Sequence, residues 1–172
     1  MSKAKLHSNR ARLIRRQALV GLLVLPALAL PMQAAAQDRL PLKGSESGTF
    51  RLLDPCEGGM TLEVSGSGHA TGLGDYRGRY RECFDPATGA VTGGTFTLTA
   101  ANGDELVGTF GGQARPTDDP NVIEYEDPGV ITGGTGRFAQ AGGSMTTSGL
   151  ANLATGEYSG TITGSVTRPT SR

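Results

Sequence analysis

From residue 48 onward the chain is built from short segments in which apolar and polar side chains alternate one by one. Such alternation is typical of a β-strand with one buried face and one solvated face, because successive side chains point to opposite sides. We expect eight strands, over approximately residues 48–53, 60–71, 73–83, 91–101, 104–112, 121–132, 143–150 and 157–167. No helical periodicity follows residue 36, so the sequence predicts an all-β fold.

The two faces of these segments differ in size and polarity. In the last segment Tyr158, Ile162 and Val166 share one face with glycines, whereas serines and threonines fill the other face. The fourth segment shows the same division, with Phe96 and Leu98 opposite a row of threonines. A face that mixes large apolar residues with glycine suits the tapered, tightly curved interior of a barrel. We expect the hydroxyl-rich face to meet water.

The connections between the segments are short, which favours antiparallel pairing of neighbours. Asn102-Gly103 predicts a two-residue type I′ turn, in which both central residues have positive φ. Eight such strands can close into an up-and-down barrel, which leaves no exposed sheet edge. The sequence therefore predicts one eight-stranded antiparallel β-barrel over residues 48–168, after an N-terminal linker over 37–47 and before a C-terminal tail over 169–172.

The polarity of the outward face and the net charge limit the partners of this barrel. A membrane-embedded barrel needs an apolar outer face with aromatic girdles, but here one face is Thr, Ser, Glu and Arg and the other is too small and glycine-rich. Without its first 36 residues the chain has a net charge near −6, because they hold six of the sixteen Lys and Arg and none of the sixteen Asp and Glu. Phosphate contacts need a basic patch, so we expect no nucleic acid partner.

The first 36 residues have the layout of a cleaved secretory signal peptide. Six basic residues precede an apolar stretch over 18–32, and three alanines at 34–36 offer a small-residue cleavage site. The stretch is interrupted by two prolines and is shorter than the roughly 20 residues of a membrane span. We therefore expect a secreted or periplasmic protein with no membrane span. Arg15-Arg16 leaves a twin-arginine signal open beside an ordinary basic region.

Cys56 and Cys83 are the two cysteines of the chain. In an exported domain an even cysteine count is most simply a disulfide, here closing a loop of about 28 residues and worth on the order of 3 to 4 kcal/mol. A reactive thiol pair or a metal site is the alternative, but His69 is the only histidine after the signal, which leaves too few soft ligands for zinc. The sequence indicates no cofactor and no metal.

A glycine-rich motif lies near the C-terminus. It consists of Gly133, Gly134, Thr135, Gly136, Arg137 and Phe138, followed by Ala141 and Gly143. This run resembles the Gly-Gly-Thr-Gly-x-Phe-x-x-Ala-x-Gly signature of the allene oxide cyclase and dirigent barrel superfamily, including its bacterial members. The resemblance implies an eight-stranded barrel of calycin type with an apolar pocket, which in the plant members guides cyclisation or radical coupling of a hydrophobic substrate. The glycines allow a sharp turn, and we expect Phe138 to plug the barrel from a short helical turn.

The alternation places several aromatic and ionisable residues inside the barrel. The candidate ligand-binding residues are Tyr76, Tyr80, Glu82, Tyr125 and Tyr158. Glu82 is also the candidate catalytic residue, because a partly buried Glu can have a raised pKa suited to general acid or base work. The simpler interpretation puts Glu82 at the rim, solvated or paired with an arginine. The polar pocket residues of the superfamily cannot be matched to this chain position by position.

Three other groups of polar residues have simple surface interpretations. His69 lies among glycines on the hydroxyl face, which favours a surface histidine over a member of a catalytic triad. Arg77, Arg79 and Arg81 could receive an anion, but a solvated stripe balanced by carboxylates such as Glu63 is simpler. Five neighbouring acidic residues lack the spacing and the glycine of a calcium loop. They are Asp118, Asp119, Glu124, Glu126 and Asp127.

Three functions fit these observations. The first is an exported barrel that binds a small hydrophobic molecule or acts as a non-catalytic structural module, and the second is a cyclase or isomerase with a hydrophobic substrate in the barrel. The third uses the Thr-x-Thr rows as an adhesive or ice-binding surface, although a curved barrel supplies no flat array. A cavity discriminates among them, since a structural module would be packed and an enzyme would add an inward ionisable group. Assembly into a homo-oligomer is left open.

Overall fold

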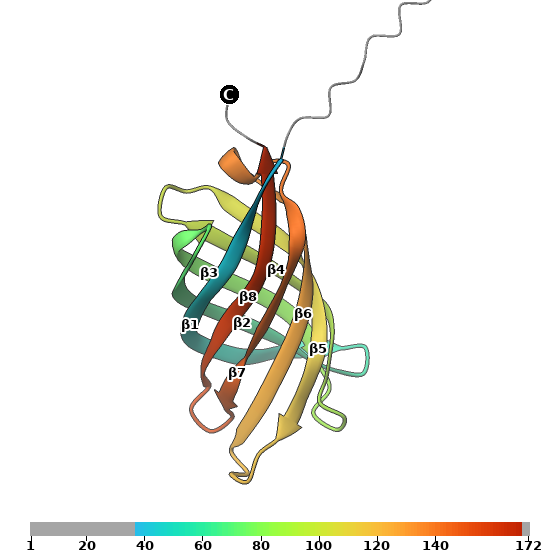
Figure 1. Cartoon of the computed structure of the whole chain (residues 1–172). Helices are drawn as coiled ribbons and strands as arrows, with labels where there is room; N and C mark the ends of the chain where they lie inside the picture. Colours follow the sequence, from blue (N-terminus) through green and yellow to red (C-terminus); the bar gives the residue numbers. More distant parts are fainter. Residues whose placement is uncertain (1–36, 170–172) are drawn as a thin grey trace, which may run out of the picture. The chain divides into compact units, whose positions relative to one another are not determined.

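The structure, a computed structural model, describes residues 37–169; the predicted signal peptide and residues 170–172 lie outside the described residues. Eight antiparallel strands form one closed barrel, in which each strand pairs with its neighbours in the sequence and β1 pairs with β8 (Figure 1). The strands are β1 (Gln37–Cys56), β2 (Gly59–Ala70), β3 (Gly74–Phe84), β4 (Ala90–Ala100), β5 (Glu105–Pro116), β6 (Val122–Gly134), β7 (Gly142–Asn152) and β8 (Glu157–Pro169). A 3₁₀ helix, η1 (Gly136–Phe138), lies between β6 and β7. The predicted eight-stranded up-and-down barrel is confirmed.

The first strand is much longer than predicted. Residues 37–47 are not a linker, because they form the first half of β1 and pair with β8 from Gln37 opposite Pro169 onward. β8 is 13 residues long, and a closed barrel must provide it with a partner along that length. Pro41 and Gly44 weaken the strand pattern in this segment, since both residue types are depleted in strand interiors.

The turn between β4 and β5 also differs from the prediction. Gly103 has a φ of 88°, but none of the described non-glycine residues has a positive φ, so the type I′ turn is not formed. The Gly103 amide donates to the Ala100 carbonyl at 2.9 Å, and the Ala100 amide donates to the Asp104 carbonyl at 2.9 Å. This pattern matches a type I turn followed by a left-handed glycine, in which Asn102 keeps an ordinary backbone conformation.

One end of the barrel is packed with large apolar side chains and closed by η1. Figure 1 shows η1 at the end where β1 begins and β8 finishes. The fully buried large side chains are Leu42, Phe96, Leu98, Leu106, Phe138, Ile162 and Val166. Phe138 has no exposed surface, and Gly136 before it has a φ of 52°, which a glycine adopts easily. The predicted plug on a short helical turn is confirmed, and we call this the closed end.

The four connections at the opposite end, which we call the open end, are short. They span residues 57–58, 85–89, 117–121 and 153–156. The Cys56–Cys83 disulfide lies here and joins the end of β1 to β3, with 5.9 Å between the two Cα atoms, so the predicted disulfide is confirmed. Within residues 37–169 no helix has the length and apolar character needed to cross a membrane.

Candidate ligand pocket

The open half of the barrel contains a cavity of about 260 Å³. It is slightly smaller than the usual range of ligand pockets, roughly 300–1,000 Å³. Its apolar lining comes from strands β1 to β7 and two connections, and consists of Phe50, Leu52, Leu62, Val64, Phe84, Pro86, Val91, Phe110, Ala114, Ile123, Ala151 and Leu153. The remaining lining residues are Glu46, Tyr80, Glu82, Tyr125, Asp127, Thr147 and Tyr158. A mainly apolar cavity with a few polar groups is the usual composition of a small-molecule site.

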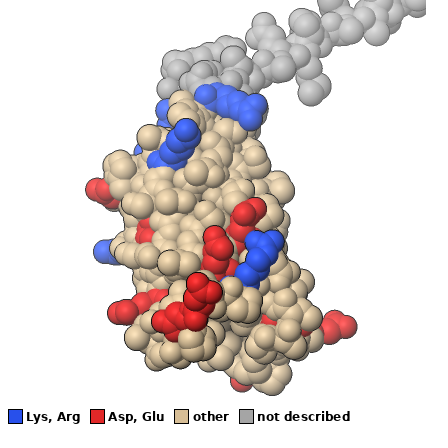
Figure 2. Space-filling model, turned by 60° about the horizontal axis from the view of Figure 1, so that its bottom comes forward, with Lys and Arg blue, Asp and Glu red and all other residues tan. Residues whose placement is uncertain are grey.

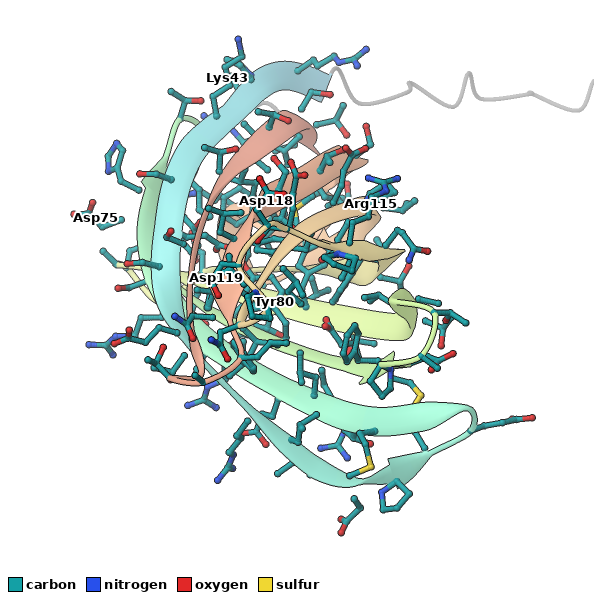
Figure 3. The ribbon with its side chains drawn as sticks, turned by 90° about the horizontal axis from the view of Figure 1, so that it is seen from below. Lys43, Asp75, Tyr80, Arg115, Asp118 and Asp119 are labelled. Carbon is teal, nitrogen blue, oxygen red and sulfur yellow. A yellow bond between two sulfur atoms is a disulfide. The ribbon has the colours of Figure 1, made fainter. Side chains whose placement is uncertain are left out.

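The structure brings four of the five predicted ligand-binding residues to this cavity. Tyr80, Glu82, Tyr125 and Tyr158 line it, whereas Tyr76 is buried next to it and is not part of its wall. Figure 3, seen from the open end, shows Tyr80 inside the ring of strands. The ring of Tyr125 meets the ring of Tyr158 edge-on, with 6.4 Å between their centres. The cavity therefore has an aromatic wall of defined geometry.

Glu46 is the most enclosed carboxylate of the pocket. Its side chain is buried, and the hydroxyls of Tyr76 and Tyr80 both donate to its Oε2 atom, at 2.9 and 2.5 Å. Burial raises the pKa of the Glu46 carboxyl, and the two tyrosine hydrogen bonds oppose this effect in part. Both hydroxyls are fixed by the same oxygen, so β1 and β3 are linked across the interior.

Glycines on the inner wall make room for the tyrosine hydroxyls. A Cβ atom on Gly68 would lie 2.8 Å from the Tyr76 hydroxyl and 2.9 Å from Cβ of Glu46. A Cβ atom on Gly66 would collide with the Tyr158 hydroxyl. The side chains of β1, β3 and β8 can therefore cross the interior because β2 presents bare backbone at these positions.

Glu82 and Asp127 form a second acidic group, contributed by β3 and β6. Burial raises the pKa of Glu82 to about 8, with a further contribution from the charge of Asp127. Burial also raises the pKa of Asp127 to about 7, helped by the charge of Glu126. Because the charge of one carboxyl opposes the ionisation of the other, the two titrate as a coupled pair.

The backbone around Glu82 is irregular. The pairing of β3 with β4 shifts register between Arg81 and Cys83, so that Glu82 lies opposite the pair Gly93 and Gly94. Gly93 has a φ of 61°, as expected for the first residue of a bulge. Bulges of this kind redirect side chains and are frequent beside functional sites.

Three buried oxygen atoms in the pocket have no hydrogen-bond partner among the described residues. They are the hydroxyls of Tyr125 and Tyr158 and the Oδ1 atom of Asp127. Asp127 is 7% exposed and Tyr158 is 8% exposed, so neither side chain can be satisfied by turning to the outside. Buried polar atoms are nearly always hydrogen-bonded to protein or to water, so these three oxygens are free to accept a hydrogen bond from a molecule inside the cavity.

The sequence analysis did not predict two of the three pocket carboxylates, Glu46 and Asp127, as site residues. Glu46 lies in the segment expected to be a linker, and Asp127 was considered only as one of five neighbouring acidic residues compared with a calcium loop. A signal was present in both cases, because Glu46 has the same parity as Leu42 and Phe50, and Asp127 has the same parity as Tyr125. Extending the alternation through Pro41 would have found Glu46.

The other candidate residues lie on the outer surface. His69 is exposed and pairs with Asp75 at 2.7 Å, and Arg77, Arg79 and Arg81 point outward, as predicted. Glu63 faces Arg81 in the ladder, although its ion pair is with Arg51. Four of the five acidic residues once considered together are also exposed; they are Asp118, Asp119, Glu124 and Glu126. In the described part of the chain no three His, Cys, Asp or Glu side chains are grouped for a metal ion.

Comparisons with known proteins support the fold. No protein-family profile matches the chain, and no curated protein matches it. Among solved structures the barrel is similar to two pterocarpan synthase dirigent proteins, GePTS1 and PsPTS1, each with a TM-score of 0.54 and 13% sequence identity. The matches cover 81% of this chain and 90% of GePTS1, and 78% of this chain and 97% of PsPTS1. The chain therefore has a dirigent-like barrel fold, in agreement with the Gly-Gly-Thr-Gly-x-Phe motif.

Proposed function

We propose that the barrel binds a small, mainly apolar molecule in its open half. The observation that carries this proposal is the cavity itself, which remains between a packed closed end and a rim that opens outward. A structural module would be filled to ordinary core density along its whole length. The chain instead places three carboxylates and three tyrosines around an apolar space, which gives a ligand both a hydrophobic environment and fixed polar contacts.

The rim of the cavity supports entry from the open end. Leu52 of β1 is 57% exposed and Leu153 of the connection at 153–156 is 47% exposed, and both belong to the cavity lining. Exposed large apolar side chains gathered at one opening are typical of a ligand entrance. The polar loop at 117–121 is one of the connections at this end.

Native mass spectrometry of the protein purified from its own cellular compartment tests this function. We expect an extra mass on the folded protein that is released on unfolding. Ala114→Phe should abolish it, because Ala114 is buried in the cavity wall and the larger ring would occupy the space. Thr109→Phe on the outer face of the same strand is the matched control and should keep the ligand. If both variants keep the extra mass equally, the ligand binds outside the cavity. If the wild-type protein shows no extra mass, the proposal of a retained ligand loses its support.

A second candidate function is an isomerase or cyclase that acts on the bound molecule. The observation in its favour is the pair Glu82 and Asp127, whose raised pKa values of about 8 and about 7 leave one protonated and one ionised carboxyl slightly above neutral pH. The protonated Glu82 could donate a proton to the substrate while the Asp127 carboxylate removes another, so that the composition of the substrate is unchanged.

Deuterium labelling separates catalysis from binding. The molecule released from the protein would be returned to it in heavy water, and its mass and isomer pattern would be followed over time. An enzyme should incorporate deuterium or change the isomer pattern, Glu82→Gln should stop this, and Tyr158→Phe should retain the activity at least in part. If the wild-type protein leaves the molecule unchanged, the barrel is a binding protein only.

A further inference from the structure

Every charged side chain that lines the cavity is acidic. Glu46, Glu82 and Asp127 belong to the lining, and among residues 37–169 no Lys, Arg or His does. An anion placed there would find no basic side chain to pair with, and its charge would oppose the ionisation of the three carboxyl groups in mainly apolar surroundings. The pocket is therefore unsuited to a fatty acid or another carboxylate ligand.

The connections at the open end, around the entrance of the cavity, are acidic as well. The four connections at this end contain no Lys or Arg, and their acidic residues are Glu57, Asp85, Asp118 and Asp119. Figure 2, in which the open end is turned forward, shows several acidic side chains on that end with a basic side chain beside them. Entrances lined by one sign of charge raise the local concentration of ligands of the opposite sign.

The aromatic wall is also suited to a positive charge. Tyr80 contacts Phe110 edge-on, with 6.1 Å between the ring centres, and Tyr125 and Tyr158 form the second such pair. The faces of aromatic rings attract cations, and clusters of aromatic residues recognise alkylated ammonium groups. Among these side chains, the unpartnered oxygens of Tyr125, Asp127 and Tyr158 can accept the N–H groups of a ligand.

We infer that the pocket takes a hydrophobic organic cation, a small aromatic or aliphatic amine whose ammonium group lies between Asp127 and Glu82 and whose apolar part fills the remaining cavity. This inference rests on the proposed function and narrows its ligand class. The ammonium group would supply the hydrogen-bond donors that Asp127 Oδ1 lacks, as a charge-assisted contact.

Binding of a cation in this place is linked to proton release. Asp127 and Glu82 bind protons more tightly than ordinary carboxyls, with pKa values of about 7 and about 8, and a bound ammonium would favour their ionised forms. The other titratable groups that face them across the interior, or act on them through the wall, are Glu46, Tyr76, Tyr80, Tyr125, Glu126 and Tyr158. No group in this set is basic, so the interior contains no competing positive charge.

Three probes with one carbon skeleton test the inference: 4-phenylbutylammonium, 4-phenylbutan-1-ol and 4-phenylbutanoate. Titration calorimetry near neutral pH should show the ammonium compound binding at least about tenfold more tightly than the alcohol, and the carboxylate binding more weakly than the alcohol. Repeating the ammonium titration in buffers of different ionisation enthalpy should reveal released protons.

Two variants locate the ammonium group. The double variant Glu82→Gln and Asp127→Asn should weaken the ammonium compound at least about tenfold and change the alcohol by less than about twofold. Glu124→Gln, an exposed carboxylate on the outward face of β6, is the matched control and should change neither. The affinities of the ammonium compound and the alcohol are compared within the same variant, so an effect of the substitutions on folding would change both affinities alike.

The outcomes separate this inference from the function on which it rests. If the alcohol or the carboxylate binds as tightly as the ammonium compound, the cation preference is wrong and the apolar pocket stands. If the double variant binds the ammonium compound as tightly as the wild-type protein does, the position assigned to the ammonium group between Asp127 and Glu82 is wrong. If none of the three probes binds, both the inference and the proposed function lose their support.

Discussion

At the scale of single residues, the pocket contains two kinds of tyrosine hydroxyl. Tyr80 donates to the buried Glu46 carboxyl at 2.5 Å, whereas the hydroxyl of Tyr158 has no partner among the described residues. The two side chains are almost equally buried, with 7% and 8% of their surface exposed. They therefore form a matched pair in which hydrogen bonding differs and burial does not.

Removing each hydroxyl should have different effects on stability. Tyr80→Phe should lower the free energy of unfolding by about 1–3 kcal/mol, because it takes a donor from a buried carboxyl. Tyr158→Phe should change it by less than about 0.5 kcal/mol, since no hydrogen bond within the protein is lost. Urea denaturation monitored by circular dichroism measures both. Equal losses would contradict the hydrogen-bond pattern.

The pocket carboxyls predict that stability falls as the pH rises. Asp127 and Glu82 have pKa values of about 7 and about 8 in the folded protein, above their ordinary values of 3.8 and 4.5. Between about pH 4 and pH 8 the folded state holds protons that the unfolded state releases. The free energy of unfolding therefore decreases as the pH rises through this range.

Urea denaturation at several pH values between these limits checks this dependence. Glu82→Gln and Asp127→Asn together should reduce the slope, because two of the three buried pocket carboxyls no longer titrate and only Glu46 remains. Glu124→Gln should keep the slope, since this carboxylate is exposed on the outer face. A slope that the double variant leaves unchanged would mean that other groups control the pH dependence.

At the scale of elements, the sequence predicted the interior strands well and the first strand poorly. β8 alternates without interruption, and β4 does so from Gly94 onward, so the existence and faces of these strands followed from the pattern. The first half of β1 contains Pro41 and Gly44 and is held by its pairing with β8, which lies more than a hundred residues away. A local pattern does not report such long-range pairing. Because the predicted first strand began only at residue 48, the predicted site did not include Glu46.

The plug at the closed end should be worth several kcal/mol. Phe138→Ala is expected to lower the free energy of unfolding by about 3–5 kcal/mol, because it leaves a void beneath η1 in the packed half of the barrel. Val130→Ala on the outer face, where Val130 is 56% exposed, is the control and should cost less than about 1 kcal/mol. A loss below about 1 kcal/mol for Phe138→Ala would mean that it does not plug the barrel.

The disulfide at the open end restrains the strands that carry the pocket. Replacing both Cys56 and Cys83 by serine should lower stability by on the order of 3 to 4 kcal/mol, because the unfolded chain regains the freedom of the loop. The denatured, unreduced wild-type protein should contain no reactive thiol in a colorimetric assay. Two titratable thiols would show that the bridge is absent in the protein as purified.

At the scale of the whole molecule, the barrel is divided into a filled half and an open half. The alternation predicted which side chains point inward but not whether they fill the space, because Gly66 and Gly68 look alike in sequence whether a tyrosine covers them or not. The closed end could be predicted from the sequence, because the Gly-Gly-Thr-Gly-x-Phe motif indicates a plug at Phe138. The cavity depends on how side chains from different strands cross the interior, which only the closed barrel determines.

Mapping of backbone amide shifts by nuclear magnetic resonance tests the division of the barrel most directly. The neutral probe 4-phenylbutan-1-ol would be titrated into the protein, since the method detects weak binding. We predict shifts in the open half, at residues such as Ala114 and Ala151, and none in the closed half at Leu98 and Ile162. Shifts confined to the outer face, or none at any concentration, would contradict a ligand pocket inside the barrel.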